Sequence, residues 1–195
     1  CEKYGVLLIF DEIRSGFRYS MGGAQKVYGI TPHLSVFGKA MANGYPISAL
    51  TGQKEYMKVI EEKVFVSSTF FPNSLEQVAA LKTIEIMERD SILDKIREKG
   101  SDFCAKAAKI VEASKLPVEF SGAPFMPYIT FLPDEKKLYK KLRADFYTSV
   151  IRQGVFLQPY HHGYVAYRHD DNDMEKALSA IQNGLNDIKD KYFKG

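Results

Sequence analysis

The sequence predicts an α/β protein in which part of a larger domain, built on a parallel or mixed sheet, precedes a small α+β domain. Five unbroken apolar residues at positions 6–10 end at Asp11, the pattern of a strand buried on both faces. Long helical patterns follow, and after them short strands alternate with helices. We therefore place a boundary near residues 90–115 and assign residues 1–100 to the larger domain and 101–195 to the smaller.

Two further strands are expected in the first part of the chain. Residues 34–37 form a short apolar run that ends at Gly38 and Lys39, and residues 47–50 form another. A glycine-rich stretch, residues 16–29, separates these strands from the first one. Acidic residues at the carboxyl end of a buried strand lie where open α/β sheets bind ligands.

Two helices connect the parts. Asn73 or Ser74 can cap a helix that runs to about Arg89. We expect its inward side chains to be the apolar ones, namely Leu75, Val78, Ala79, Leu81, Ile84 and Met87. The next helix has one apolar face, made of Ile92, Ile96, Phe103, Ala107 and Val111.

The last part of the chain alternates between strand and helix patterns. Strands are expected at residues 118–121, 126–132, 155–157 and 164–167. One helix is marked by Leu138, Leu142, Phe146 and Val150, and a closing helix runs from Asp171 to Tyr192. Paired lysines at positions 136–137 and 140–141 alternate with leucines, which is typical of a solvated helix face.

The composition is that of a globular protein. Of 195 residues, 45% are apolar and 26% are charged, and the net charge of +3 is too small to indicate nucleic-acid binding. No apolar run approaches the roughly 20 residues that span a bilayer. Two cysteines, Cys1 and Cys104, cannot form a disulfide framework, so we expect a reducing, cytoplasmic location. The chain enters a strand pattern almost at once and without an initiator Met, which is how a fragment begins.

Asp11 and Lys39 are the central candidate pair. Both follow apolar strands, so the fold could bring them to one edge of one sheet. On spacing alone two interpretations stay open, because a turn-capping aspartate and a surface lysine are both common at strand ends.

The local sequence around the pair is more specific. Three segments carry it in order: residues 8–18 (LIFDEIRSGFR), 22–32 (GGAQKVYGITP) and 37–47 (FGKAMANGYPI). This series resembles the class III aminotransferases, most closely their glutamate-1-semialdehyde aminomutase branch. The resemblance covers nearly all of the chain and weakens after about residue 115. It implies fold type I of the pyridoxal-phosphate (PLP) enzymes, PLP as cofactor, and a small-molecule amino substrate.

The resemblance also implies roles for individual residues. Asp11 would pair with the pyridine nitrogen of the cofactor, and Ile13 stands where the family packs a valine on the ring face. Lys39 would form the Schiff base with PLP and move the proton. Thr69 matches a threonine that contacts the cofactor phosphate of the neighbouring subunit, which implies a homodimer with shared active sites. Two phenylalanines in residues 70–72 would then lie in the interface.

Other interpretations of the motifs fail. A phosphate-binding P-loop needs glycine and Ser or Thr where this chain has His33 and Ala40. His161, His162 and His169 suggest a metal site, but no acid or cysteine has ligand spacing with them, so we expect no metal. In the resembling family the loop of His161 and His162 lies near the mouth of the active site.

The first half of the family pattern is absent from the sequence. The expected function is transfer or 1,2-shift of an amino group through Lys39, and the sequence leaves aminotransferase and aminomutase both open. The alternative is a cofactor-free half-domain that assembles with a companion N-terminal chain.

Overall fold

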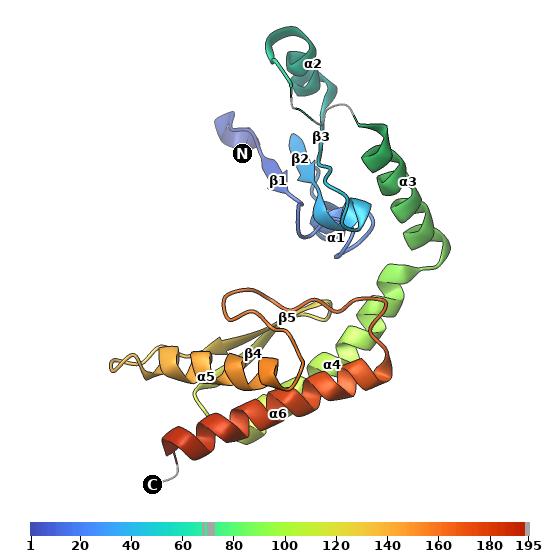
Figure 1. Ribbon diagram of the computed structural model, residues 1–195. Helices are drawn as coiled ribbons and strands as arrows, with labels where there is room; N and C mark the ends of the chain where they lie inside the picture. The colour runs from blue at the N-terminus through green and yellow to red at the C-terminus, as the bar shows by residue number, and fades with distance from the viewer. Residues whose placement is uncertain (68, 70–72, 194–195) are drawn as a thin grey trace. The chain divides into compact units, whose positions relative to one another are not determined.

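The computed structural model describes residues 1–67, 69 and 73–193 (Figure 1). The chain forms two compact units, Cys1–Leu93 and Asp94–Gly195, which are called the first and the second unit below.

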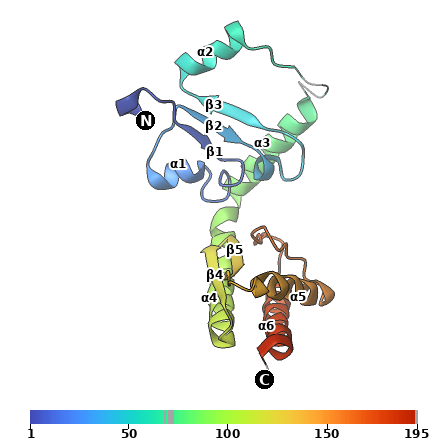
Figure 2. The same ribbon diagram turned by 90° about the vertical axis from the view of Figure 1, so that its left-hand side faces the viewer.

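The first unit contains a three-stranded mixed sheet, whose strands lie side by side in Figure 2. Strand β1 (Ile9–Asp11) pairs in parallel with β2 (Leu34–Phe37), and β2 pairs antiparallel with β3 (Ala49–Gly52), in the order β1-β2-β3. The prediction for β2 is confirmed, and β3 begins two residues later than the predicted 47–50. In the register of β1 and β2, Asp11 is opposite Val36.

The prediction that residues 6–10 are buried on both faces is wrong for this chain. Ile9 is 54% exposed, and Val6 and Leu7 before it are exposed as well. The physical reason is that burial of a strand's faces requires elements packed over the sheet, and the described residues leave these side chains uncovered. A continuous apolar run indicates that its side chains prefer burial. Whether they are buried depends on the elements that pack over the strand.

Short helices surround this sheet. They are the 3-10 turns η1 (Glu2–Tyr4) and η2 (Lys39–Ala42) and the helices α1 (Gly23–Tyr28) and α2 (Lys54–Lys63). Helix α1 was not predicted, because it lies within the glycine-rich stretch of residues 16–29. A small core forms where Met41 and Ala42 of η2 pack with Ala80.

Helix α3 (Ser74–Arg89) begins as predicted, because the Asn73 side chain accepts a hydrogen bond from the Leu75 N–H at 3.2 Å. Its predicted inward face is wrong in part: Leu75, Val78 and Leu81 are 59–70% exposed. The buried residue is Ala80, with Ile84 packed beside it. The small alanine lets η2 approach the helix closely. The buried face of the helix is therefore the one that contains Ala80, and not the one that carries its largest apolar residues.

The second unit packs a hairpin and helices around one core (Figure 1). Helix α4 begins just before this unit and spans Ile92–Ser114. The strands β4 (Val118–Ala123) and β5 (Met126–Phe131) form an antiparallel hairpin, followed by α5 (Leu138–Arg152) and α6 (Asp171–Phe193). These elements confirm two of the four strands predicted here and all three helices. The predicted apolar face of α4 is buried throughout: Ile92, Ile96, Phe103, Ala107 and Val111.

The two strands predicted at residues 155–157 and 164–167 are wrong, since both stretches are irregular. Gly163 and Val165 donate backbone hydrogen bonds to Pro127 and Phe125 at 2.8 and 3.2 Å. Two such bonds attach the segment to the hairpin without making a ladder, and Pro159 within it has no N–H to donate.

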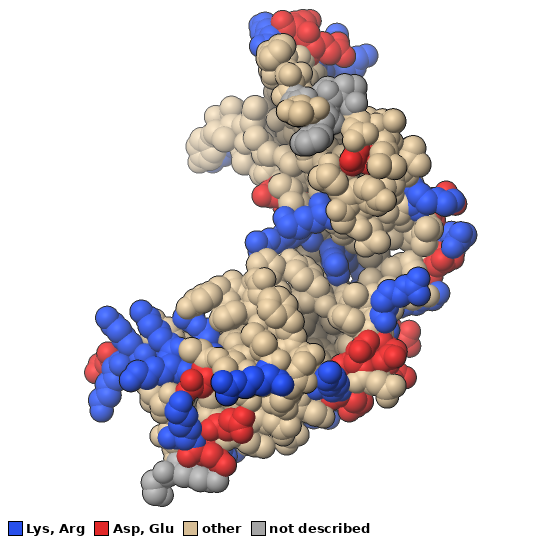
Figure 3. Space-filling model, in the orientation of Figure 1, with Lys and Arg blue, Asp and Glu red and all other residues tan. Residues whose placement is uncertain are grey.

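The paired lysines at positions 136–137 and 140–141 are exposed, as predicted. Figure 3 shows basic side chains gathered at this end of α5. Among the helices of the described residues, none is long and apolar enough to cross a membrane.

Candidate functional site

Asp11 and Lys39 lie at the same edge of the sheet in the first unit. Asp11 is the last residue of β1, and Lys39 follows the last residue of β2 by two positions. Because β1 and β2 run parallel with Asp11 opposite Val36, their carboxyl ends meet at one edge. Both side chains are exposed there. The fold thus presents a carboxylate and a primary amine at the position where open α/β sheets bind ligands.

Ile13 joins this pair. Its backbone N–H donates a hydrogen bond of 3.0 Å to Oδ1 of Asp11, which fixes the orientation of the carboxylate. A Cβ atom built on Gly38 would lie 3.8 Å from Cγ2 of Ile13, so this half-buried side chain sits beside the residue that precedes Lys39. The structure therefore places Asp11, Ile13 and Lys39 at the same edge of the sheet.

The backbone of Lys39 adopts a left-handed conformation with φ of 45°. For a residue with a Cβ atom this conformation costs about 1–2 kcal/mol. Met41 and Ala42 are buried in the core directly after it, and the Met41 N–H donates to the Gly38 carbonyl at 3.1 Å. These contacts hold η2 in place, so the strained backbone at Lys39 is maintained by its surroundings.

Glu12, which the sequence analysis did not single out, is buried next to Asp11. Its carboxylate accepts hydrogen bonds from the Ala24 and Gln25 N–H groups, both at 2.9 Å, and from the Ser15 hydroxyl. Successive strand residues point to opposite faces, so exposed Asp11 implies an inward Glu12. The sequence signal for this burial was an acidic residue followed by a glycine-rich stretch, whose backbone N–H groups can donate to a carboxylate.

Thr69 is exposed in a turn before α3. The residue is therefore accessible to solvent. The phenylalanines predicted to lie in an interface, within residues 70–72, are outside the described residues.

The sequence model described as aminotransferase class-III matches residues 1–185 of the chain. The chain belongs to this family. The family predicted from the residue motifs is therefore confirmed, although the chain spans about half the length of the curated relatives it matches.

Two relatives of this class III aminotransferase chain show the range of the family. The chain is 62% identical to the 3-aminobutyryl-CoA aminotransferase of Cloacimonas acidaminovorans (strain Evry), over 96% of the chain and 45% of that protein. It is 33% identical to the glutamate-1-semialdehyde 2,1-aminomutase of Archaeoglobus fulgidus, over 92% of the chain and 46% of that protein.

Solved structures agree with the predicted fold. The PLP internal aldimine form of the FumI protein of Sphingopyxis sp. MTA144 matches with a TM-score of 0.89 and 27% identity, over 100% of the chain and 46% of that protein. An omega-transaminase from Sphaerobacter thermophilus matches with a TM-score of 0.86 at 22% identity, over 96% of the chain and 46% of that protein, which shows the fold alone. Fold type I of the PLP enzymes is confirmed.

The groups at the sheet edge of this class III aminotransferase fit pyridoxal phosphate. The cofactor needs an amine for its aldehyde and an anion for its pyridine nitrogen, and Lys39 and Asp11 present these at neighbouring strand ends. The Ile13 N–H bonds to one oxygen of the exposed Asp11 carboxylate, and Gly38 carries no side chain that would block an approach to Lys39.

His161 and His162 of the second unit belong to an aromatic cluster. The rings of His161 and His162 are 5.0 Å apart and both lie beside Tyr164, while His162 also meets Tyr128 edge-on. They line a hollow of about 620 Å³ within the second unit. Across the described residues, no three His, Cys, Asp or Glu side chains are placed to hold a metal ion.

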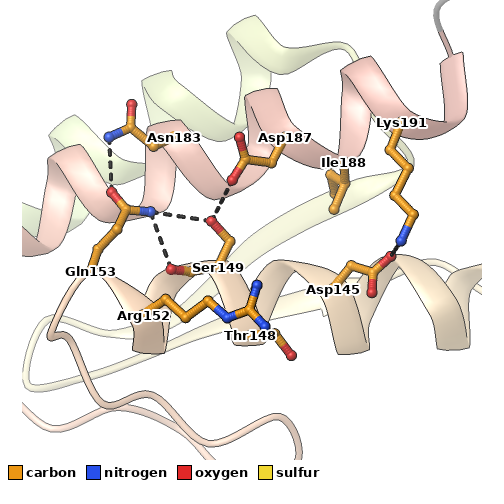
Figure 4. A pocket seen from close by; sticks show the side chains of 9 residues that line it. All are labelled: Asp145, Thr148, Ser149, Arg152, Gln153, Asn183, Asp187, Ile188 and Lys191. Atoms are coloured by element: carbon orange, nitrogen blue, oxygen red, sulfur yellow. Dashed lines mark hydrogen bonds and ion pairs between the residues drawn. The ribbon is translucent and has the colours of Figure 1, made fainter.

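A second hollow, of about 520 Å³, lies between α5 and α6 (Figure 4). Its polar side chains bond to one another across the two helices: Ser149 donates to Asp187 at 2.5 Å, and Lys191 forms an ion pair with Asp145 at 2.7 Å. Gln153, itself bonded to Ser149, accepts a bond of 2.8 Å from Asn183. This network joins the helices, so we assign it a structural role.

Proposed function

We propose that the protein is a PLP-dependent aminotransferase in which Lys39 holds the cofactor and Asp11 binds its ring nitrogen. One observation carries the proposal: in a chain of the class III family, an amine and a carboxylate stand at the carboxyl ends of two adjacent parallel strands. When bound, PLP supplies an electron sink that stabilises negative charge on the substrate carbon.

The side chains of the chain have separate tasks in this proposal. Lys39 would hold the cofactor through its Nζ amine and would serve as the base that moves the proton at the substrate carbon. Asp11, whose carboxylate accepts a hydrogen bond from the Ile13 N–H, would hold the proton on the pyridine nitrogen. The Ile13 side chain, which lies beside Gly38, would help to hold the cofactor ring by apolar contact.

The proposed substrate is a small molecule with an amine at carbon 3 of an acyl thioester. The 62% identity to a protein named 3-aminobutyryl-CoA aminotransferase supports this choice. An aminomutase acting by a 1,2-shift is the second candidate, supported by the 33% identity to glutamate-1-semialdehyde 2,1-aminomutase. The two differ in one observable: a mutase converts one substrate without a second amino acceptor, whereas an aminotransferase requires the acceptor.

The assembly and location belong to the same proposal. The first unit would be part of the cofactor-binding domain, divided from the small domain near residues 90–115. The protein would be a cytoplasmic homodimer, with Thr69 reaching the cofactor phosphate of the neighbouring subunit. The exposed Thr69 hydroxyl before the N-terminus of α3 supports this, because a hydroxyl and helix N–H groups suit a phosphate.

The test is chemical labelling of the complete protein. Borohydride reduction in the presence of PLP, followed by peptide mapping, should place the cofactor on Lys39. Lys39→Ala should lose the visible absorbance of the bound cofactor, while Lys54→Ala, an exposed lysine at the start of α2, should retain it. Label on a different lysine would overturn the assignment, and a wild type without bound cofactor would favour the assembly half-domain.

A further inference from the structure

Glu12 is the one charged side chain that the structure buries among the described residues, with 1% of its surface exposed. Burying a carboxylate is unfavourable unless hydrogen bonds replace the water it loses. A buried charge one position from Asp11 therefore requires an explanation, and the proposed chemistry does not use it directly.

Donors from the turn after β1 and from the first turn of helix α1 satisfy this carboxylate. Ala24 and Gln25 donate their backbone N–H groups, one to each oxygen, and Ser15 donates its hydroxyl. Gly23 makes the approach possible: a Cβ atom there would lie 2.6 Å from an oxygen of Glu12, and its φ of 72° is left-handed. The turn after β1 and the start of α1 thus surround the carboxylate, which accepts three hydrogen bonds.

The backbone of Glu12 ties the same loop to the sheet. Its N–H donates to the carbonyl of Val36 at 2.8 Å, next to the position where Asp11 pairs with β2. Its carbonyl accepts from the Gly16 N–H at 2.8 Å, which closes the turn that contains Ile13. Glu12 therefore links the end of β1, the end of β2 and the segment from Ser15 to Gln25 through its hydrogen bonds.

We propose that Glu12 is a positioning residue that fixes the turn bearing Asp11 and Ile13, so that the Asp11 carboxylate keeps its place against the pyridine nitrogen. This inference rests on the proposed function. Glu12 does not touch the cofactor in this arrangement; it acts through the backbone that orients Asp11. A charged acceptor is required, because the amide of a glutamine would turn an NH₂ group toward a backbone N–H.

The decisive variant is Glu12→Gln in the complete protein, which keeps the size of the side chain and removes its charge. We expect the cofactor to bind and KM to stay near the wild-type value, while kcat falls about tenfold or more. We also expect the midpoint of the pH titration of the bound cofactor's visible band to rise, because a less protonated ring withdraws fewer electrons from the bond to Lys39. Amide hydrogen exchange at Ala24 and Gln25 should become faster, and this readout needs no activity.

Two further variants guard against a Glu12→Gln protein that fails to fold. Ser15→Ala removes one of the three donors and should move the titration midpoint in the same direction by a smaller amount. Gly23→Ala leaves Glu12 in the sequence but displaces its carboxylate, and should reproduce the Glu12→Gln spectrum. Ser114→Ala is the matched control, since Ser114 is a buried, hydrogen-bonded polar residue of the second unit and should lower stability without moving the titration.

The outcomes separate the two proposals. If the wild type binds no PLP, the proposed function fails. If the wild type binds PLP and transfers amino groups while Glu12→Gln keeps its titration midpoint and kcat, Glu12 has no positioning role. If Glu12→Gln does not fold, unchanged spectra in both Ser15→Ala and Gly23→Ala overturn the inference, and graded shifts support it.

Discussion

Gly16 lies so close to Phe37 that a Cβ atom at residue 16 would be 2.5 Å from Cδ1 of the ring. The same atom would be 2.7 Å from the carbonyl oxygen of Glu12. Phe37 is the last residue of β2, and its ring also meets Phe17 edge-on at 5.9 Å between centroids. The loop after β1 is thus packed directly on the strand that leads to Lys39.

A methyl group at Gly16 should therefore destabilise the first unit. Overpacking of this kind costs about 1–3 kcal/mol, and here one neighbour is backbone that cannot move aside. Urea unfolding of Gly16→Ala should show a lower midpoint than wild type. Gly29→Ala is the comparison, because its φ of 65° strains a side chain but no atom lies within 4 Å of its Cβ position. Equal losses in the two variants would contradict the packing argument.

Asp11→Asn should leave PLP bound and reduce turnover by about a hundredfold or more. A neutral amide does not stabilise a protonated pyridine nitrogen, and a single electrostatic contact of this kind is worth about 3 kcal/mol. The measurement is single-turnover kinetics of the complete protein, with cofactor content checked by absorbance. Turnover near the wild-type rate would mean that another group holds the ring nitrogen.

Thr69 is predicted to serve the site of the neighbouring subunit, and mixing two inactive variants tests this. A dimer of one Lys39→Ala subunit and one Thr69→Ala subunit has one site with both defects and one site with neither. Some activity should therefore return when subunits exchange. If mass spectrometry shows mixed dimers and no activity returns, Thr69 does not act across the interface.

Cys104 should react slowly with alkylating reagents. Burial raises the pKa of its thiol to about 11, and its Sγ lies 3.7 Å from the carbonyl oxygen of Pro124. Since the thiolate is the reactive form, iodoacetamide near neutral pH should label exposed Cys1 first. Labelling of Cys104 should accelerate sharply in denaturant, when the second unit unfolds. Equal rates for the two thiols in the folded protein would show that Cys104 is accessible.

The ion pair of Asp145 should make the second unit sensitive to acid. Hydrogen bonds from Lys191 and then Tyr192 hold the pKa of Asp145 below its ordinary value of 3.8. A carboxyl whose pKa is lowered by folding contributes stability above that ordinary value, and the contribution is lost as the pH falls through the folded pKa. The contribution is modest, since both side chains are partly exposed.

Thermal unfolding of Asp145→Asn against pH checks this sign. The variant should be less stable than wild type near neutral pH, and the difference should shrink below pH 3.8. Glu135→Gln, which changes an exposed carboxylate before α5, is the control and should show little difference at any pH. A difference that persists unchanged in acid would assign the effect to packing instead of charge.

The sequence by itself determined the family, the strand ends that carry Asp11 and Lys39, and the core of the second unit. These are local properties. The motifs around Asp11 and Lys39 are contiguous stretches of sequence. The apolar residues Phe103, Ala107 and Val111 all lie within one helix, at helical spacing. The spacing of apolar residues along a helix does not depend on the elements that pack against it. The buried face of α4 was therefore predictable.

Only the tertiary structure decided which apolar surfaces are covered and which polar groups are paired. The exposure of Ile9 and Leu81 depends on the neighbours of β1 and α3, which no local pattern specifies. The burial of Glu12 depends on N–H groups that lie more than ten residues away in the chain, at Ala24 and Gln25. The sequence does not show whether a glutamate is solvated or buried. Its role follows from the hydrogen-bond donors that the fold places around its carboxylate.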